Sequence, residues 1–112
     1  MPFQKIIDQL RAMKGVEGVV FLDAEGETIL SSGEHPETLK VLGAYQSIVL
    51  AQIRSLGWPD NQTIITICEQ RSILTHHLKD GYFLCVVFSR ELSPGLAKFR
   101  FQEPFELIKK EL

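Results

Sequence analysis

Hydrophobic and polar residues follow one another in patterns that predict the order helix, two strands, helix, three strands, helix. In residues 3–14 the apolar positions stand three and four residues apart, which is typical of an amphipathic helix. Residues 16–23 contain a β-branched and aromatic run that favours a buried strand. Residues 24–27 predict a turn, and residues 28–32 predict the returning strand of a hairpin.

The longest helical pattern covers residues 36–56, and the glycine and proline in residues 57–59 should end it. Further along, Asp80-Gly81 predicts a hairpin turn, because both residues tolerate the positive φ angles of a two-residue turn. An earlier turn is expected at residues 69–72. The strands around these turns are expected at residues 62–68, 73–78 and 82–89.

A last helix is expected after Ser93, since serine suits the N-cap position and Pro94 suits the first helical turn. This helix reaches the end of the chain. Pro104 should kink or split it, because proline removes one helical hydrogen bond and its ring crowds the preceding turn.

Three of the strands are continuous apolar runs, and such strands need cover on both faces of a sheet. The predicted helices can supply that cover. The pattern therefore predicts one α/β domain over residues 1–112, a three-layer sandwich with helices on each side of an antiparallel sheet.

Composition and charge exclude several classes of function. The formal net charge is −2, and lysine and arginine are scattered, whereas a dedicated nucleic-acid binder shows a basic face. No apolar stretch approaches the roughly 20 residues of a membrane span, and the N-terminus does not resemble a signal peptide. We expect a cytoplasmic protein with no nucleic-acid partner and no membrane insertion.

Cysteine and histidine side chains offer little chemistry. Cys68 and Cys85 both lie in apolar runs, where a small buried hydrophobe is expected, and two cysteines cannot form a four-ligand zinc site. His76 and His77 should point to opposite faces of a strand, so they cannot hold one ion together. Two-residue turns at residues 70–71 and 80–81 would place His76 beside Cys85 and Ile65. Mid-sheet, that pair lacks the exposure that a reactive thiolate needs.

No phosphate-binding glycine loop of the P-loop type is present, and no set of nucleophile, base and orienting residue can be assembled. We expect no catalytic residue, no metal and no cofactor. Arg71 at a turn and Arg54 on the middle helix could each serve as an arginine finger toward a GTPase, although most exposed arginines only improve solubility.

The middle helix is unusually apolar. Between Leu39 and Leu56 the sequence has no acidic residue, and Lys40 and Arg54 are its charged residues. Its large apolar side chains spread over an arc of roughly 200°, whereas a helix with one face on a sheet needs little more than about 100°. Small residues occupy the remaining arc: Gly43, Ala44, Ser47, Ala51 and Ser55. Either this helix is buried within the monomer, or its extra surface meets a second copy or another partner.

The order of the elements and three segments resemble the roadblock/dynein light chain family, including its bacterial gliding-protein GTPase regulators. Residues 15–23 with Glu25-Gly26 and Ile29 look like the opening hairpin of that family. Residues 63–89, with Arg71 at the first turn and Asp80-Gly81 at the second, look like its three-stranded second half. The helix after residues 92–95 is similar to its last helix.

The resemblance implies a five-stranded antiparallel sheet with the middle helix on one face and the terminal helices on the other. It also implies a homodimer that joins the middle helices and the third strands, and a Ras-like small GTPase as the partner to be regulated or scaffolded. The residues expected at the dimer or partner interface are Leu39, Gly43, Ala44, Ser47, Ile48, Leu50, Ala51, Arg54, Thr63 and Ile65. The alternative is a small-molecule sensor or adaptor domain that holds a ligand between sheet and helix.

Overall fold

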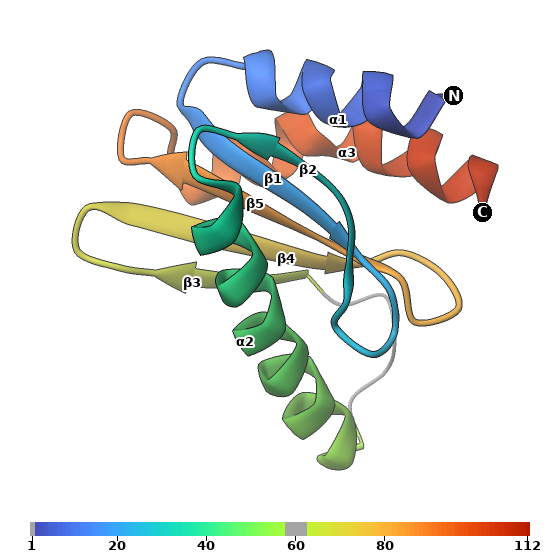
Figure 1. Ribbon diagram of the computed structural model, residues 1–112. Helices are drawn as coiled ribbons and strands as arrows, with labels where there is room; N and C mark the ends of the chain where they lie inside the picture. The colour runs from blue at the N-terminus through green and yellow to red at the C-terminus, as the bar shows by residue number, and fades with distance from the viewer. Residues whose placement is uncertain (1, 58–62) are drawn as a thin grey trace.

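A five-stranded antiparallel sheet lies between helices in the computed structural model, which describes residues 2–57 and 63–112 (Figure 1). The helices are α1 (Pro2–Ala12), α2 (Pro36–Ser55) and α3 (Pro94–Glu111). The strands are β1 (Val16–Leu22), β2 (Thr28–Gly33), β3 (Thr63–Ile67), β4 (Arg71–His77) and β5 (Phe83–Ser89). The order of elements along the chain is the predicted one.

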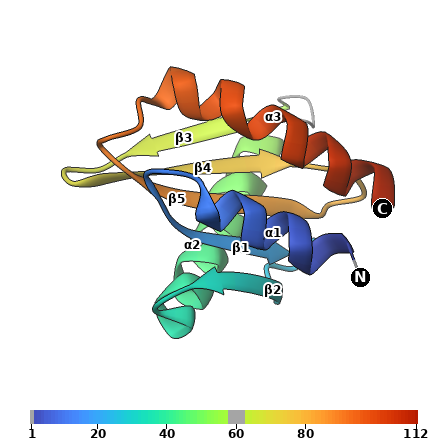
Figure 2. The same ribbon diagram turned by 90° about the horizontal axis from the view of Figure 1, so that it is seen from above.

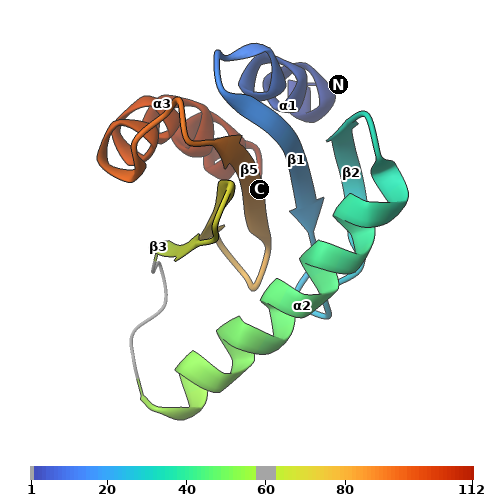
Figure 3. The same cartoon turned by 90° about the vertical axis from the view of Figure 1, so that its left-hand side faces the viewer.

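The strands lie side by side in the order β2-β1-β5-β4-β3, so β2 and β3 form the two edges of the sheet. Helices α1 and α3 cover one face, as the view in Figure 2 shows. Helix α2 crosses the other face, and Figure 3 shows it running diagonally from β2. The predicted three-layer sandwich is confirmed, with the middle helix and the terminal helices on opposite faces.

The central strands β1 and β5 supply a core to each face, because successive side chains of a strand point to opposite sides. On the face of α1 and α3 the core contains Val19, Phe21, Leu84, Val86, Phe88 and Phe101. On the face of α2 the core contains Val20, Leu22, Cys85, Val87, Leu39 and Leu50. This double burial explains the uninterrupted apolar runs at residues 19–22 of β1 and 83–88 of β5.

Helix α3 begins as predicted, with the Ser93 hydroxyl accepting a hydrogen bond from the Leu96 N–H at 3.3 Å. The expectation that Pro104 splits the helix is wrong, since α3 runs unbroken from Pro94 to Glu111. Pro104 is buried between Phe101 and Phe105, which are also buried. Packing on both sides of the proline therefore outweighs the hydrogen bond that it removes.

Helix α2 ends at Ser55, followed by Gly57 with a φ of +80°. Trp58 and Pro59, which were expected to help end this helix, lie outside the described residues, as does Gln62 of the expected third strand.

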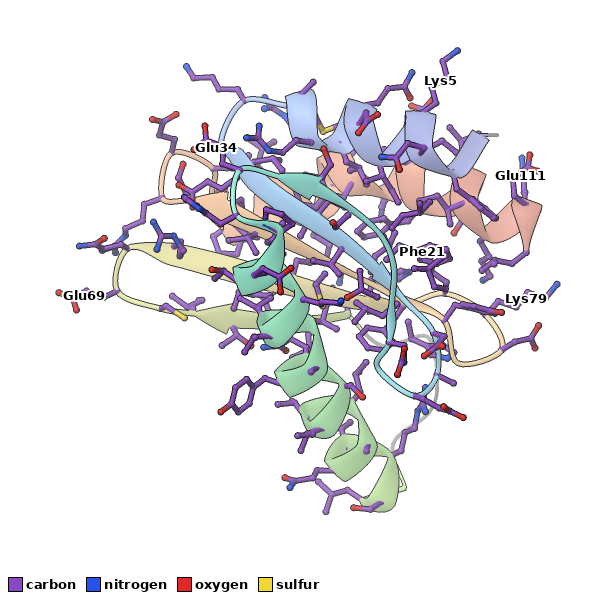
Figure 4. All side chains as sticks on the ribbon, in the orientation of Figure 1. Lys5, Phe21, Glu34, Glu69, Lys79 and Glu111 are labelled. Atoms are coloured by element: carbon purple, nitrogen blue, oxygen red, sulfur yellow. The ribbon has the colours of Figure 1, made fainter. Side chains whose placement is uncertain are left out.

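The turn between β3 and β4 lies one position earlier than the two-residue turn that the sequence suggested. The Cys68 N–H donates to the Arg71 carbonyl at 2.9 Å, so Glu69 and Gln70 form the turn and Arg71 begins β4. Figure 4 shows Glu69 at this end of the sheet and Lys79 at the opposite end. Cys68 is exposed beside the turn, which corrects the expectation of a buried thiol.

The predicted turn at Asp80-Gly81 is present, and both residues have positive φ, 54° and 84°. The Leu78 N–H donates to the Tyr82 carbonyl, while the Tyr82 N–H donates to the Lys79 carbonyl. Lys79 is therefore an extra residue on the side of β4, and the register of β4 against β5 moves by one.

Because the register differs, the expected neighbourhood of His76 with Cys85 and Ile65 is wrong. His76 lies opposite Thr63 and Leu84, whereas Cys85 lies opposite Thr75. His76 and Cys85 consequently face opposite sides of the sheet, and no thiol–imidazole pair can form between them.

Alanine substitutions at Gly81 and Gly57 can test how tightly the turns pack. Gly81→Ala should lower the free energy of unfolding by about 3 kcal/mol, because alanine is strained at positive φ and its Cβ would crowd a neighbouring turn. That Cβ would lie 2.5 Å from the Cβ of Ala24. Gly57 has a similar φ of +80° but no described atom within 4 Å of a new Cβ, so Gly57→Ala should cost only about 1 kcal/mol.

Urea unfolding followed by circular dichroism would measure both losses. Adding Ala24→Gly to Gly81→Ala should restore the part of the free energy of unfolding that Gly81→Ala loses beyond the loss in Gly57→Ala. Equal losses in Gly81→Ala and Gly57→Ala would contradict the close contact of the two turns.

Candidate protein-interaction surface

Helix α2 contacts the sheet through a narrow face. Leu39, Gly43, Gln46 and Leu50 are its buried residues, and their spacing of four, three and four positions forms one stripe of a helix. A Cβ on Gly43 would lie 2.6 Å from Cδ2 of Leu22, so glycine lets the helix approach β1 closely. This stripe occupies only part of the apolar surface of α2.

Four large apolar side chains of α2 and that of its C-cap residue are exposed. We call this set the outer arc: Val41, Tyr45, Ile48, Val49 and Leu56. Tyr45 is 66% exposed, Val41 58% and Ile48 57%. A contiguous exposed patch of large apolar residues is typical of a protein-interaction site.

A groove of about 550 Å³ separates the outer arc from β4. Its lining residues are Glu37, Thr38, Val41, Leu42, Tyr45, Gln46 and Ile73. Gln46 is a buried polar residue of the groove, and its Oε1 accepts a hydrogen bond from the Thr75 hydroxyl at 3.1 Å. The surface that α2 leaves open beside the sheet is therefore mainly apolar.

Strand β3 pairs with β4, which lines the groove through Ile73, and forms one edge of the sheet. Its residues Ile64, Ile65 and Thr66 are half-buried, and Ile67 is 69% exposed. No charged residue occurs in this strand. Natural edge strands usually carry charges, prolines or bulges that prevent pairing with another chain, so an uncharged edge favours association.

The structure separates the ten predicted interface residues into groups. Ala44, Ile48 and Ala51 are exposed on α2, and Thr63 and Ile65 are half-buried at the β3 edge. Leu39, Gly43 and Leu50 are buried against the chain's own sheet, and their place at an interface stays a prediction.

Ser47 and Arg54 turn away from the outer arc. Ser47 packs on the β1–β2 turn, since a Cβ on Gly26 would lie 2.7 Å from its hydroxyl oxygen. Arg54 lies on the flank of α2 opposite Tyr45, because nine residues rotate a helix by about 180° beyond complete turns.

Sequence reasoning missed Tyr45 and Val49 as surface residues. Val41, Tyr45 and Val49 follow one another at intervals of four residues, which marks a second stripe parallel to the buried one. The four-residue spacing can be recognised in the sequence, but the sequence does not reveal which of the two stripes contacts the sheet. In the structure the stripe that contains Gly43 contacts it, because glycine lets this stripe lie close to Leu22.

A second cleft, of about 760 Å³, lies on the other face of the sheet between the β3 edge and α3. His76 is directed into the protein there: its Nδ1 lies 2.7 Å from Oγ1 of Thr63, and its ring stacks on Phe105 with centroids 4.8 Å apart. Burial lowers the pKa of His76 to about 4. The imidazole is therefore neutral at physiological pH and serves packing.

The other candidate chemical groups are also separated. His77 is buried on the face opposite His76, beside Phe83. Burial raises the pKa of the Cys85 thiol to about 12, although its hydrogen bond with Thr75 acts in the other direction. No cluster of three metal-ligating side chains occurs within residues 2–57 and 63–112.

Arg71 is held at the surface by an ion pair. Its Nε donates to Oε1 of Glu17 on β1 at 2.8 Å, and both side chains are partly exposed. The pair borders a third cleft, of about 520 Å³, near the start of α2, which also includes Glu34 and His35 (Figure 4 labels Glu34). The arrangement is polar and accessible, but it presents no activated group.

Solved structures match this fold over almost the whole chain, whereas no family model and no curated protein matches the sequence. A roadblock/LC7 domain from Streptomyces avermitilis is similar with a TM-score of 0.85 and 15% identity, over 96% of this chain and 95% of that one. MglB from Myxococcus xanthus is similar with a TM-score of 0.85 and 17% identity, over 98% and 94%. An MglB in a tetrameric arrangement has a TM-score of 0.81 and 14% identity, over 97% and 86%.

The chain therefore has the roadblock/LC7 fold, which agrees with the resemblance of its sequence. Among the described helices, none combines the length and the hydropathy required to cross a membrane.

The buried position of His76 predicts a loss of stability in acid. The folded protein keeps the ring neutral down to its pKa of about 4, whereas the unfolded chain protonates it near 6.5. Stability from this site is complete above pH 6.5 and falls as the pH decreases toward 4, because protonation favours the unfolded state there. Glu106 opposes this effect, and His77, Lys98 and Lys109 reinforce it.

Urea unfolding at pH 7.5 and pH 5 would measure the loss in the wild type and in His76→Gln. Between these two pH values the free energy of unfolding should fall by about 1 kcal/mol less in the variant than in the wild type. This value is reduced for the partial contact of the ring with water. An identical pH dependence in both proteins would show that His76 is not desolvated.

Proposed function

We propose that this chain is a dimeric protein-binding module that regulates or scaffolds a Ras-like small GTPase. The observation that carries the proposal is the exposed outer arc of α2 together with the uncharged edge of β3. Each of these two elements has a surface that a single copy leaves uncovered. Neither element has chemistry of its own, so the surface is suited to binding.

A second copy can complete both elements at once. Two β3 strands that pair edge to edge would join the sheets of two copies, and their unpaired backbone groups would gain partners. The outer arcs would then shield one another from water, which stabilises association through apolar burial. One similar structure is an MglB in a tetrameric arrangement, so copies of this fold associate in that protein.

The GTPase partner rests on the resemblance to the roadblock/dynein light chain family, whose members bind Ras-like GTPases as activators or scaffolds. The fold supports this proposal, since similar structures include MglB and a roadblock/LC7 domain. We propose that the chain acts without catalytic residues, because Cys85 and His76 face opposite sides of the sheet. Any effect on a GTPase would then arise from contact with its surface.

The dimer can be tested by placing charge on the outer arc. Tyr45→Glu combined with Val49→Glu should convert a dimer into a monomer, since two buried carboxylates per subunit would lose hydration without a partner. Light scattering coupled to size exclusion would give the mass at micromolar concentration. Phe99→Glu is the control, because Phe99 is an exposed aromatic residue on α3, on the other face of the sheet.

The wild type and Phe99→Glu should both have twice the mass of the double variant. A monomeric wild type would contradict the proposal, and so would a double variant that is folded and still dimeric.

The GTPase can be tested by affinity capture. Immobilised wild-type protein should retain a small GTPase from a lysate of the source organism, identified by mass spectrometry through its P-loop sequence. The purified GTPase should then show either a changed rate of GTP hydrolysis, at least about threefold and thus well above error, or stable binding without a change in rate. Absence of any small GTPase above a bead control would contradict the proposal.

A further inference from the structure

The cleft of about 760 Å³ between the sheet and α3 has the size of a small-molecule site. Such sites usually measure about 300–1,000 Å³. The outer arc of α2 lies on the other face of the sheet, as the positions of α2 and α3 in Figure 3 show. Binding in this cleft therefore does not depend on the proposed function.

The floor of the cleft is uncharged. Oγ1 of Thr63 lies 2.7 Å from Nδ1 of His76, and the His76 ring stacks on Phe105 with 14° between the ring planes. Burial lowers the pKa of His76 to about 4, so the imidazole carries no charge at neutral pH. Two stacked rings and one hydroxyl are suited to an apolar or aromatic group rather than to an ion.

The wall of the cleft on α3 has polar side chains at a regular spacing. Lys98, Gln102 and Glu106 follow one another at intervals of four residues, so they form one stripe along the helix. Each of the three follows a buried residue of α3 by one position, which places their stripe about 100° around the helix from the buried one. The cleft is therefore lined by a cation, an amide and a carboxylate in succession.

The charges of this stripe are not paired with each other. Within the part of the chain that the structure describes, neither Lys98 nor Glu106 forms an ion pair. Both lie near the floor of the cleft: burial dominates the pKa of His76, but the charge of Glu106 raises it and that of Lys98 lowers it further. Opposite charges that remain apart beside an uncharged floor are suited to a ligand that carries both charges.

The lining argues against other classes of ligand. A phosphate ester would meet one lysine and two carboxylates, those of Glu103 and Glu106, so repulsion would exceed attraction. A simple amine would leave Lys98 without a counter-charge. A metal ion is not favoured either, because no group of three metal-ligating side chains occurs among the described residues.

We propose that this cleft binds a free α-amino acid with an apolar or aromatic side chain. Lys98 and the Gln102 amide hold its carboxylate, and Glu106 holds its ammonium group. Its side chain lies over the stacked rings of His76 and Phe105. Lys98 and Glu106 are about 12 Å apart along the helix axis, a span that two long side chains and one amino acid between them can bridge.

Calorimetric titration of the full chain with L-phenylalanine tests the site. The dissociation constant should be below about 1 mM, a modest affinity for a ligand of this size. 3-Phenylpropanoate lacks the ammonium group and phenethylamine lacks the carboxylate, so each should bind at least about tenfold more weakly. Glycine lacks the side chain and should also bind at least about tenfold more weakly.

Two results of this titration would overturn the proposal. An analogue that binds as tightly as L-phenylalanine would overturn the ligand class. Absence of saturable binding up to about 10 mM would overturn the site itself, and it would leave the proposed function intact.

The roles of the two charges have matched controls on the same helix. Lys98→Met and Glu106→Gln should each weaken binding of L-phenylalanine at least about tenfold, because each removes a charge and keeps the length of the side chain. Lys110→Met and Glu111→Gln alter the same residue types on α3 outside the cleft, and should change the dissociation constant less than about twofold. A cleft variant that binds no more weakly than its control would overturn the assigned contact.

Heteronuclear NMR of the wild type locates the ligand without any substitution. L-Phenylalanine should shift the backbone amide signals of Thr63, His76 and Gln102 more than that of Tyr45 on α2. Larger shifts along α2 than along α3 would place the ligand on the other face and overturn the proposal.

Discussion

The close approach of α2 to β1 is the contact on which the rest of this structure depends. Gly43 permits it, because any side chain there would meet Leu22. Once this stripe lies on the sheet, the stripe of Val41 and Tyr45 must face away from it. The apolar surface of α2 is then wider than the sheet contact needs, and the excess is exposed on the outer arc.

The two turns that flank β4 determine which face of the sheet each of its side chains joins. The turn at Glu69 and Gln70 and the extra residue Lys79 place His76 on the side of α3 and Cys85 on the side of α2. A shift of one residue would exchange the faces of every side chain in β4. The same register brings Thr63 to His76 and so couples the edge strand to the core beneath α3.

The order and the type of the elements could be predicted from the sequence, because each amphipathic pattern is local and each turn carries a recognisable signal. The β4 register could not, since Gln70-Arg71 and Glu69-Gln70 are equally plausible as turns and only the hydrogen bond from Cys68 distinguishes them. The predicted break at Pro104 is wrong for a different reason. Local propensity favours a break, whereas burial of the proline and of its neighbours Phe101 and Phe105 favours a continuous helix. At the candidate surface, the sequence revealed the excess of apolar residues on α2 but not its direction.

Symmetry links the two exposed features of the candidate surface. A two-fold contact uses the same patch on both copies, so each patch must complement itself. An antiparallel strand edge meets this condition, because its donors and acceptors match those of an identical strand turned through half a rotation. A helix with a uniformly apolar stripe meets it as well, since no charge along Val41, Tyr45 and Val49 opposes its own copy. Both features therefore support the proposal of a second copy of the chain at this position, and in that proposed dimer a different protein would bind elsewhere.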